Sequence, residues 1–145
     1  MIVRLYKPED QQAIELIQQE SQSSLRANTP EGFFSDLTNI PAAFEGGLFL
    51  VAELEGRVAG FGGLFADGEI VRMRVRADCR RKGVATHILQ ALIAGAKQLG
   101  MKQVHLHTLE EQHSAQQLYL AFGFVETERG ELHGNRVVAY HLSID

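Results

Sequence analysis

A glycine preceded by three basic residues is the most informative short segment of this sequence. Arg80, Arg81 and Lys82 stand directly before Gly83, and the small residue Ala85 follows two positions later. A helical pattern begins at the same point, and the first backbone N–H groups of a helix have no partners inside the helix. With the helix dipole these groups bind anions, and a glycine lets a phosphate approach the backbone. The segment therefore predicts a phosphate-binding loop at the entry of a helix.

Positive charge is concentrated around this loop. The chain has 14 Lys and Arg residues against 18 Asp and Glu, which gives a net charge of −4. Six of the 14 basic residues fall within eleven positions: Arg72, Arg74, Arg76, Arg80, Arg81 and Lys82. The acidic balance argues against general affinity for nucleic acid or an anionic membrane. The local positive field indicates a small, highly charged anionic ligand, with a solvated basic face as the alternative.

Composition sets the broad class of the protein. A chain of 145 residues with 45% hydrophobic and 22% charged residues is typical of one globular domain, here residues 1–145. The one cysteine, Cys79, cannot form an internal disulfide, which is compatible with a reducing compartment. No apolar run is long enough to span a bilayer, and no N-terminal targeting pattern is evident. We therefore expect a cytoplasmic protein with no membrane partner.

Hydrophobic periodicity predicts the elements that hold the loop. Strands are expected at 2–6, 48–54, 57–65, 69–76, 103–108, 124–127 and 136–143. Helices are expected from Pro8 to the serines at 21–24, from about Thr29, over 81–99, and around Tyr119. This order predicts an α/β protein with a mixed sheet and helices on its faces. It places the loop between the fourth strand and the clearest helix of the chain.

The motifs around the loop resemble those of the GNAT superfamily of N-acetyltransferases. The resemblance rests on Arg72-Met73-Arg74-Val75, on Arg80-x-x-Gly83-x-Ala85, and on Leu118-Tyr119 followed by Gly123-Phe124. It covers the element order of nearly the whole chain and is strongest over 69–124. It implies a central, mostly antiparallel sheet of about seven strands, flanked by four helices and splayed between the fourth and fifth strands.

The resemblance also implies acetyl-CoA as the co-substrate. The loop amides would bind the CoA pyrophosphate, and the backbone beside a bulge in the fourth strand would pair with the pantetheine arm as an added strand does. Gln112 stands where many members have an asparagine, and it offers the same amide from a longer stem. The expected cofactor-binding residues are Met73, Arg74, Val75, Arg80, Arg81, Lys82, Gly83, Val84, Ala85, Gln112 and Tyr119.

Two residues are expected to take part in the chemistry that the resemblance implies. Tyr119 matches the tyrosine that protonates the departing thiolate in many members, and Glu69 matches a glutamate that acts as a general base through water in some. The residues alone leave alternatives open: Tyr119 also fits a core aromatic, and Glu69 also fits an exposed carboxylate beside a turn. Cys79 has no evident base beside it, so we interpret it as a small filler.

The acceptor is expected to contact Arg72, Phe33 and Phe34. In an extended strand Arg72 and Arg74 share one face with Arg76, and one of them could pair with a carboxylate of an amino-acid-like acceptor. Salt bridges to neighbouring acidic residues are the alternative, which we favour for Arg74 and Arg76.

Two histidines of one expected strand could begin a metal site. His105 and His107 project to one face of a strand, and a His-x-His pair can begin such a site. The spacing places no third ligand beside them, so we expect no metal.

Together these patterns favour an acetyl-CoA-dependent N-acetyltransferase. It would transfer the acetyl group to a primary amine of a small molecule, amino-acid-like in one reading, or of a protein, by direct attack in a ternary complex. The alternative is a non-catalytic CoA-binding sensor of the same fold, which the departure at Gln112 keeps open. We expect no nucleic-acid partner, because the basic run lacks interleaved aromatic residues. A homodimer is left open.

Overall fold

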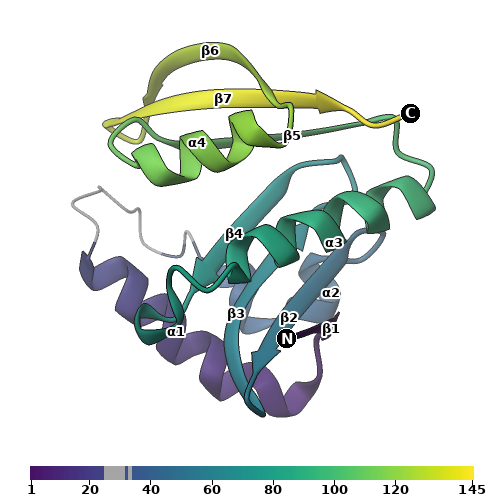
Figure 1. Ribbon diagram of the computed structural model, residues 1–145, viewed down its shortest axis with the longest axis vertical. Coiled ribbons are helices and arrows are strands. Elements are labelled where there is room, and N and C mark those ends of the chain that lie inside the picture. The colour runs from purple at the N-terminus through teal and green to yellow at the C-terminus, as the bar shows by residue number, and fades with distance from the viewer. Residues whose placement is uncertain (25–31, 33) are drawn as a thin grey trace.

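The computed structural model describes residues 1–24, 32 and 34–145. Within these residues seven strands form two antiparallel sheets, one above the other in Figure 1. The first sheet has the order β1-β2-β3-β4, and the second has the order β5-β7-β6. The strands are β1 (Ile2–Leu5), β2 (Leu48–Leu54), β3 (Arg57–Leu64), β4 (Ile70–Val75), β5 (Gln103–Leu109), β6 (Val125–Leu132) and β7 (Asn135–Ser143). The expected sheet of seven strands is therefore split in two, at the position where the splay was predicted.

Helices cover both faces of the first sheet. Helices α1 (Gln11–Ser24) and α2 (Ile40–Ala43) pack on one face, and α3 (Val84–Gln98) packs on the other. Helix α4 (His113–Ala121) lies against the second sheet (Figure 1). Short 3₁₀ turns precede α1, α2 and α3, at Pro8–Asp10, Ser35–Thr38 and Ala77–Cys79. The expected number of four helices is confirmed, but the second begins at Ile40, and the start predicted near Thr29 lies outside the described residues.

Strand β2 shows how the sequence builds two hydrophobic layers. Its side chains alternate between the faces, as in any strand. Phe49 and Val51 pack with Ile14 of α1, whereas Leu50 and Ala52 pack in the cluster that contains α3. All four residues are at most 7% exposed, so the continuous apolar run of β2 marks a strand covered by helices on both sides.

Glycines in β3 let α3 approach the sheet closely. A Cβ atom added at Gly62 would lie 2.9 Å from Cγ2 of Ile88, and one added at Gly60 would lie 2.6 Å from the carbonyl oxygen of Arg74. Side chains at these positions would push α3 and β4 away from β3. The glycines therefore fix the start of α3, and the phosphate loop before it, close to β4.

Strands β4 and β5 are the edge strands that face each other across the split. Among the described residues they are joined by one isolated parallel bridge between Glu69 and His105, where the His105 N–H donates to the Gly68 carbonyl at 3.0 Å. From this bridge the two strands diverge (Figure 1). The predicted bulge is present: β4 shifts register against β3, and Arg72 adopts a left-handed φ of 58°. None of the described helices has the length and apolar character to cross a membrane.

Candidate active site

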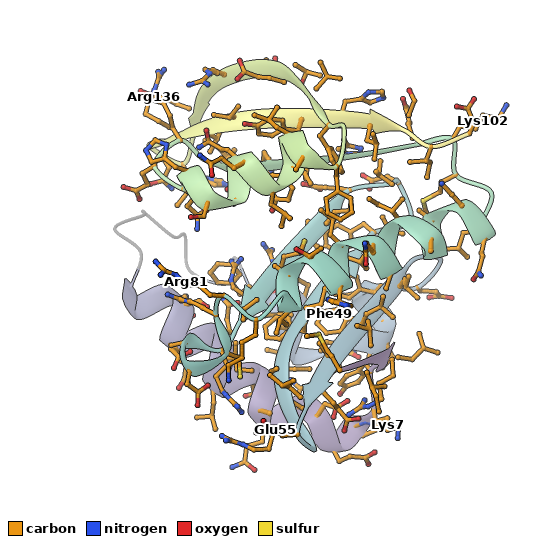
Figure 2. The ribbon with its side chains drawn as sticks, viewed as in Figure 1. Lys7, Phe49, Glu55, Arg81, Lys102 and Arg136 are labelled. Atoms are coloured by element: carbon orange, nitrogen blue, oxygen red, sulfur yellow. The ribbon has the colours of Figure 1, made fainter. Side chains whose placement is uncertain are left out.

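The predicted phosphate loop lies at the N-terminus of α3. Gly83, the residue before the helix, has a left-handed φ of 80°, and no side chain among the described residues caps the helix. The first helical hydrogen bond runs from the His87 N–H to the Gly83 carbonyl, so the amides of Val84 and Ala85 precede it. The three basic residues before Gly83 are exposed. Figure 2 shows one of them, Arg81, on the side of the molecule where β4 and β5 diverge.

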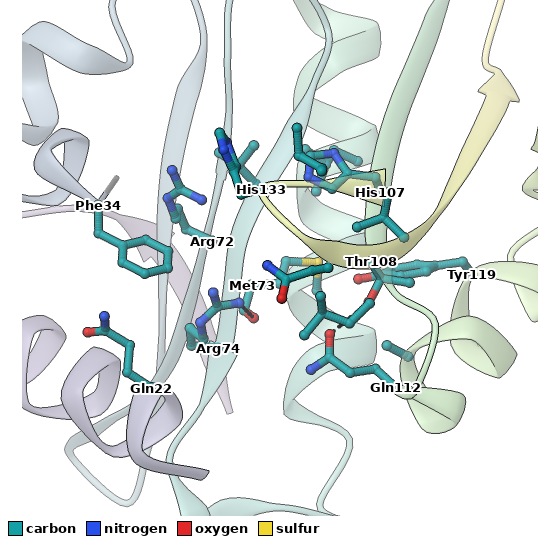
Figure 3. Close-up of a pocket in the computed structure, with 17 residues that line it drawn as sticks. Gln22, Phe34, Arg72, Met73, Arg74, His107, Thr108, Gln112, Tyr119 and His133 are labelled. Carbon is teal, nitrogen blue, oxygen red and sulfur yellow. Dashed lines mark hydrogen bonds between the residues drawn. The ribbon is translucent and has the colours of Figure 1, made fainter. Parts of the chain in front are cut away.

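A pocket lies between β4 and β5 where the strands part (Figure 3). Helix α1, both edge strands, α4 and the β6–β7 hairpin contribute to its walls. Six of the predicted site residues line it: Phe34, Arg72, Met73, Arg74, Gln112 and Tyr119. The structure thus brings together side chains from positions 34 to 119 that the sequence connected only through motifs.

Tyr119 joins the hydrophobic core to this pocket. Its ring packs against Phe124 and Tyr140, with centroid distances of 5.8 and 5.9 Å. Figure 3 shows its hydroxyl end directed toward the pocket. Burial raises the pKa of Tyr119 to about 12, and the nearby positive charge of Arg74 opposes this rise. The phenol is therefore protonated at neutral pH and can donate a proton. Tyr119 is thus both a core aromatic and a residue of the pocket, so its two interpretations are compatible.

Glu69 contacts a histidine that lines the pocket. It is not among the residues that line the cavity, but its Oε2 lies 3.4 Å from Nδ1 of His107, which does line it. The His107 side chain is 38% exposed and that of Glu69 is 25% exposed. Sequence reasoning treated His107 only as a metal candidate. The sequence contains no signal for this contact, because it depends on the long-range bridge between Glu69 and His105.

The two arginines of the pocket have different partners. Arg72 forms a two-point ion pair with Asp36, with Nε–Oδ1 and Nη2–Oδ2 distances of 3.1 and 2.8 Å. Arg74 donates from Nε to Gln18 Oε1 at 3.1 Å and from Nη1 to the Met73 carbonyl at 2.9 Å. The Phe34 ring lies 4.7 Å from the Arg72 guanidinium carbon and 5.9 Å from that of Arg74.

The observed partners of the three arginines can be compared with their predicted roles. Arg72, expected to contact the acceptor, lines the pocket but is paired with Asp36. Arg76 follows the end of β4 and pairs with Asp78 at 2.6 Å outside the pocket, as the salt-bridge alternative predicted. The same alternative fails for Arg74 within the described residues, because none of their carboxylates pairs with it.

The chain matches a known family over most of its length. Residues 12–124 match the model of the acetyltransferase (GNAT) family. The chain belongs to the GNAT family. It is 35% identical over 95 residues to a probable N-acetyltransferase, camello, of Xenopus laevis, and 31% identical over 96 residues to an uncharacterized N-acetyltransferase of Methanocaldococcus jannaschii. These alignments cover 61% and 63% of this chain but 43% and 56% of the relatives, so the chain spans about half the length of the relatives it matches.

Solved structures show the same GNAT fold. An acetyltransferase of the GNAT family from Staphylococcus aureus Mu50 superposes with a TM-score of 0.85 at 21% identity, covering 99% of both chains. A putative acetyltransferase from Salmonella typhimurium, solved with its cofactor acetyl-CoA, superposes with a TM-score of 0.85 at 19% identity, covering 100% of this chain and 94% of that one. At such identities the likeness concerns the fold.

The remaining predicted site residues of this GNAT protein are placed as follows. Gln112 precedes α4 and lines the pocket, where its Oε1 accepts a hydrogen bond from the Thr108 hydroxyl at 2.9 Å. Val75 pairs with Gly60 in the first sheet and does not line the cavity. Cys79 is 3% exposed and lies outside the pocket lining, which favours the filler interpretation. Phe33 lies outside the described residues.

One cluster of the described residues has ligand types that suit a metal. Oxygen and nitrogen atoms of Asp67, Glu69 and His105 lie within 4.8 Å of one another, beside the bridge between β4 and β5. Oδ1 of Asp67 already accepts the Glu69 backbone N–H at 2.9 Å, and the Glu69 carboxylate also faces His107. The cluster contains His105 but not His107, so it is not the His-x-His site that the sequence suggested. The absence of a metal stays a prediction.

Proposed function

We propose that this chain is an acetyl-CoA-dependent N-acetyltransferase that acetylates a primary amine of a small molecule or a protein. One arrangement carries the proposal: strand β4 and the hydroxyl end of Tyr119 border the pocket (Figure 3), and the first residue of α3, Val84, lies next to the end of β4, where both approach Gly60. A donor with phosphates at one end and a thioester at the other fits this arrangement. The GNAT structure from Salmonella typhimurium solved with acetyl-CoA supports it.

Two features of the backbone, the N-terminus of α3 and the edge of β4, would bind the donor. The amides at the start of α3, with the exposed charges of Arg80, Arg81 and Lys82, suit the pyrophosphate of CoA. Strand β4 is the last strand of its sheet and carries the bulge at Arg72. Its free edge can pair with the amides of the pantetheine arm as with an added strand. The thioester would then lie at Met73, inside the pocket.

The transfer itself needs no covalent enzyme intermediate. The amine nitrogen attacks the thioester carbonyl carbon, a backbone N–H of β4 polarises that carbonyl, and the carbon–sulfur bond breaks as the tetrahedral intermediate collapses. Tyr119 donates its hydroxyl proton to the departing sulfur, and the phenolate regains a proton as the attacking nitrogen loses one to become the amide nitrogen. Its raised pKa keeps the donor protonated, while the charge of Arg74 makes the proton easier to release. Direct attack in a ternary complex is therefore the proposed route.

The attacking amine must first lose a proton, because a primary amine is mostly an ammonium ion at neutral pH. His107 lines the pocket and can accept this proton, while the Glu69 carboxylate holds Nδ1 in the donor state. Nε2 is then the acceptor, and the partly exposed ring can pass the proton to water. In this proposal Glu69, which the resemblance predicts as a general base acting through water, positions His107 instead.

A thiol-release assay tests the proposed function. The protein is incubated with acetyl-CoA and, in turn, with amino acids, polyamines and peptides, and free CoA is measured against a protein-free control. We expect amine-dependent release of CoA together with acetylated product. Binding of acetyl-CoA without turnover on any amine would favour the sensor alternative. A lack of acetyl-CoA binding would overturn both.

A further inference from the structure

We infer that Arg74 binds a carboxylate of the acceptor, and that the acceptor is therefore a free amino acid rather than a polyamine or the N-terminus of a peptide. The inference rests on the proposed function, because it concerns the acceptor side of the same pocket. It assigns to Arg74 the acceptor contact that the sequence left open among three arginines and for which it favoured Arg72.

The first step is the charge of the pocket wall. Arg72 is neutralised by its two-point ion pair with Asp36. Arg74 donates only to neutral oxygens, those of Gln18 and Met73, and no carboxylate of the described residues pairs with it. Burial, and then repulsion by Arg72, lower the pKa of Arg74 to about 10. Among the described residues the guanidinium is thus a partly buried cation on a pocket wall with no ion-pair partner, and an anionic ligand would stabilise it.

The second step is the type of anion. Because Asp36 compensates Arg72, the arginine pair leaves one uncompensated positive charge. A single charge matches a monoanion such as a carboxylate, whose two oxygens also fit the planar fork of a guanidinium. A polyamine would place further positive charge against this wall and be repelled. The charge count therefore favours an amine that carries one carboxylate.

The third step is the distance between the two groups of the acceptor. Arg74 lines the same pocket as Tyr119, and its charge acts on the Tyr119 hydroxyl. In an α-amino acid one carbon separates the amine from the carboxylate, so a carboxylate bound to Arg74 keeps the amine beside the transfer site. The N-terminus of a peptide has an uncharged amide at that position. Free amino acids therefore fit both groups at once.

The fourth step is the rigidity of Arg74. Gln18 is 5% exposed, and its Oε1 holds Nε of Arg74 at 3.1 Å. The Phe34 ring lies 5.9 Å from the guanidinium carbon and supports its face. A guanidinium held in this way loses little conformational freedom on binding an anion. The geometry is that of a pre-organised recognition group.

Matched acceptor pairs test the inference. Amino acids such as alanine, methionine and phenylalanine are compared with their carboxamides, which keep the amine and lose the charge. We expect the wild-type kcat/KM to favour the acids about 10- to 100-fold, as for the loss of a hydrogen bond to a charged group. Arg74→Gln should bring the ratio close to one. Arg76→Gln, on the same segment but outside the pocket, should leave the ratio unchanged.

The outcomes separate this inference from the proposed function. Turnover of polyamines or peptides with no preference for amino acids over their amides overturns the inference and leaves the acetyltransferase proposal standing. An acid-to-amide ratio that Arg74→Gln does not change also overturns it. If Arg74→Gln does not fold, Arg74→Lys keeps the charge and loses the fork, and an unchanged ratio in that variant contradicts fork recognition. Turnover of no amine at all overturns the proposed function.

Discussion

Tyr119 shows at the scale of one residue how a core position can also serve chemistry. Its side chain is 8% exposed, its ring contacts Phe124 and Tyr140, and its hydroxyl borders the pocket. The ring contributes to stability, whereas the hydroxyl takes part in the proposed proton transfer. A change that removes only the hydroxyl should therefore separate the two roles.

For Tyr119→Phe we predict a fall in kcat of about 10²-fold or more, as for loss of a general acid, because the ring remains and the proton donor is lost. Steady-state kinetics and calorimetric titration with acetyl-CoA measure the two effects, and the affinity should stay within about threefold. Tyr140→Phe is the matched control, since its ring contacts Tyr119 but does not line the pocket. Equal rates for Tyr119→Phe and the wild type would remove the acid assignment.

The pair of Glu69 and His107 gives a prediction about pH. For His107→Gln we predict a fall in kcat/KM of about 10²-fold at neutral pH, because the proposed acceptor of the ammonium proton is then lost. The loss should shrink as the pH approaches about 10, near the pKa of a primary amine, where the free base is abundant. pH–rate profiles measure this effect. Glu69→Gln should lower kcat/KM at neutral pH by a smaller factor, and this loss should also shrink at high pH. His141→Gln, which changes a histidine that contacts Gln103 outside the pocket lining, should leave the profile unaltered. An unchanged rate in His107→Gln would contradict the base role.

Helix α3 is the element that connects the sheet to the phosphate end of the proposed donor. Two glycines flank it: Gly83 with φ of 80° and Gly100 with φ of 84°. Both adopt the left-handed conformation, so a side chain strains both sites to a similar degree. The two positions differ in what they face, because Gly83 begins the helix beside the basic residues and Gly100 follows its end.

For Gly83→Glu we predict loss of measurable acetyl-CoA binding, because the new carboxylate occupies the helix N-terminus and repels the pyrophosphate. Calorimetry provides the measurement. Gly100→Glu carries the same strain and charge at the opposite end of α3, and its Cβ would meet no atom within 4 Å. It should bind like the wild type. Equal affinities for both variants would contradict the placement of the pyrophosphate.

The elements also show what local sequence can and cannot predict. Strand β2 and helix α3 were predictable, because their apolar patterns are strong and local. Strand β6 was predicted to end at 127 but runs to Leu132, since its mostly exposed residues form a strand only by pairing with β7. The split of the sheet between β4 and β5 was expected only from the family resemblance. The contact of Glu69 with His107 arises from this long-range arrangement, which no spacing pattern contains.

At the scale of the whole molecule, a buried ion pair ties the first strand to the first helix. Arg4 donates to both oxygens of Asp10 at 2.8 Å, and the Asp10 side chain is 4% exposed. The hydrogen bond from Arg4 lowers the pKa of Asp10, and the backbone N–H of Lys7 acts in the same direction. A carboxyl group with a lowered pKa stabilises the fold above its unfolded pKa of about 3.9. This contribution is lost as the pH falls through the lowered folded pKa.

For Asp10→Asn we predict a loss of about 2–4 kcal/mol in the free energy of unfolding at pH 7, because Arg4 loses its two-point partner and keeps only the 3.4 Å ion pair with Glu53. Below pH of about 4 the difference from the wild type should narrow, since the wild-type carboxyl also becomes neutral. Urea unfolding at both pH values measures this. Asp78→Asn, whose side chain is 64% exposed, should change stability little. A constant difference across pH would contradict the linkage.

The central claim is that acetyl-CoA and an amine meet in one pocket and react directly. Initial velocities measured while both substrates vary, with the best acceptor of the panel, test this claim most directly. Double-reciprocal lines that intersect are the predicted result, because both substrates must be bound before transfer. Parallel lines would contradict the account, since they indicate an acetylated enzyme intermediate, and so would acetyl-CoA binding with no turnover of any amine.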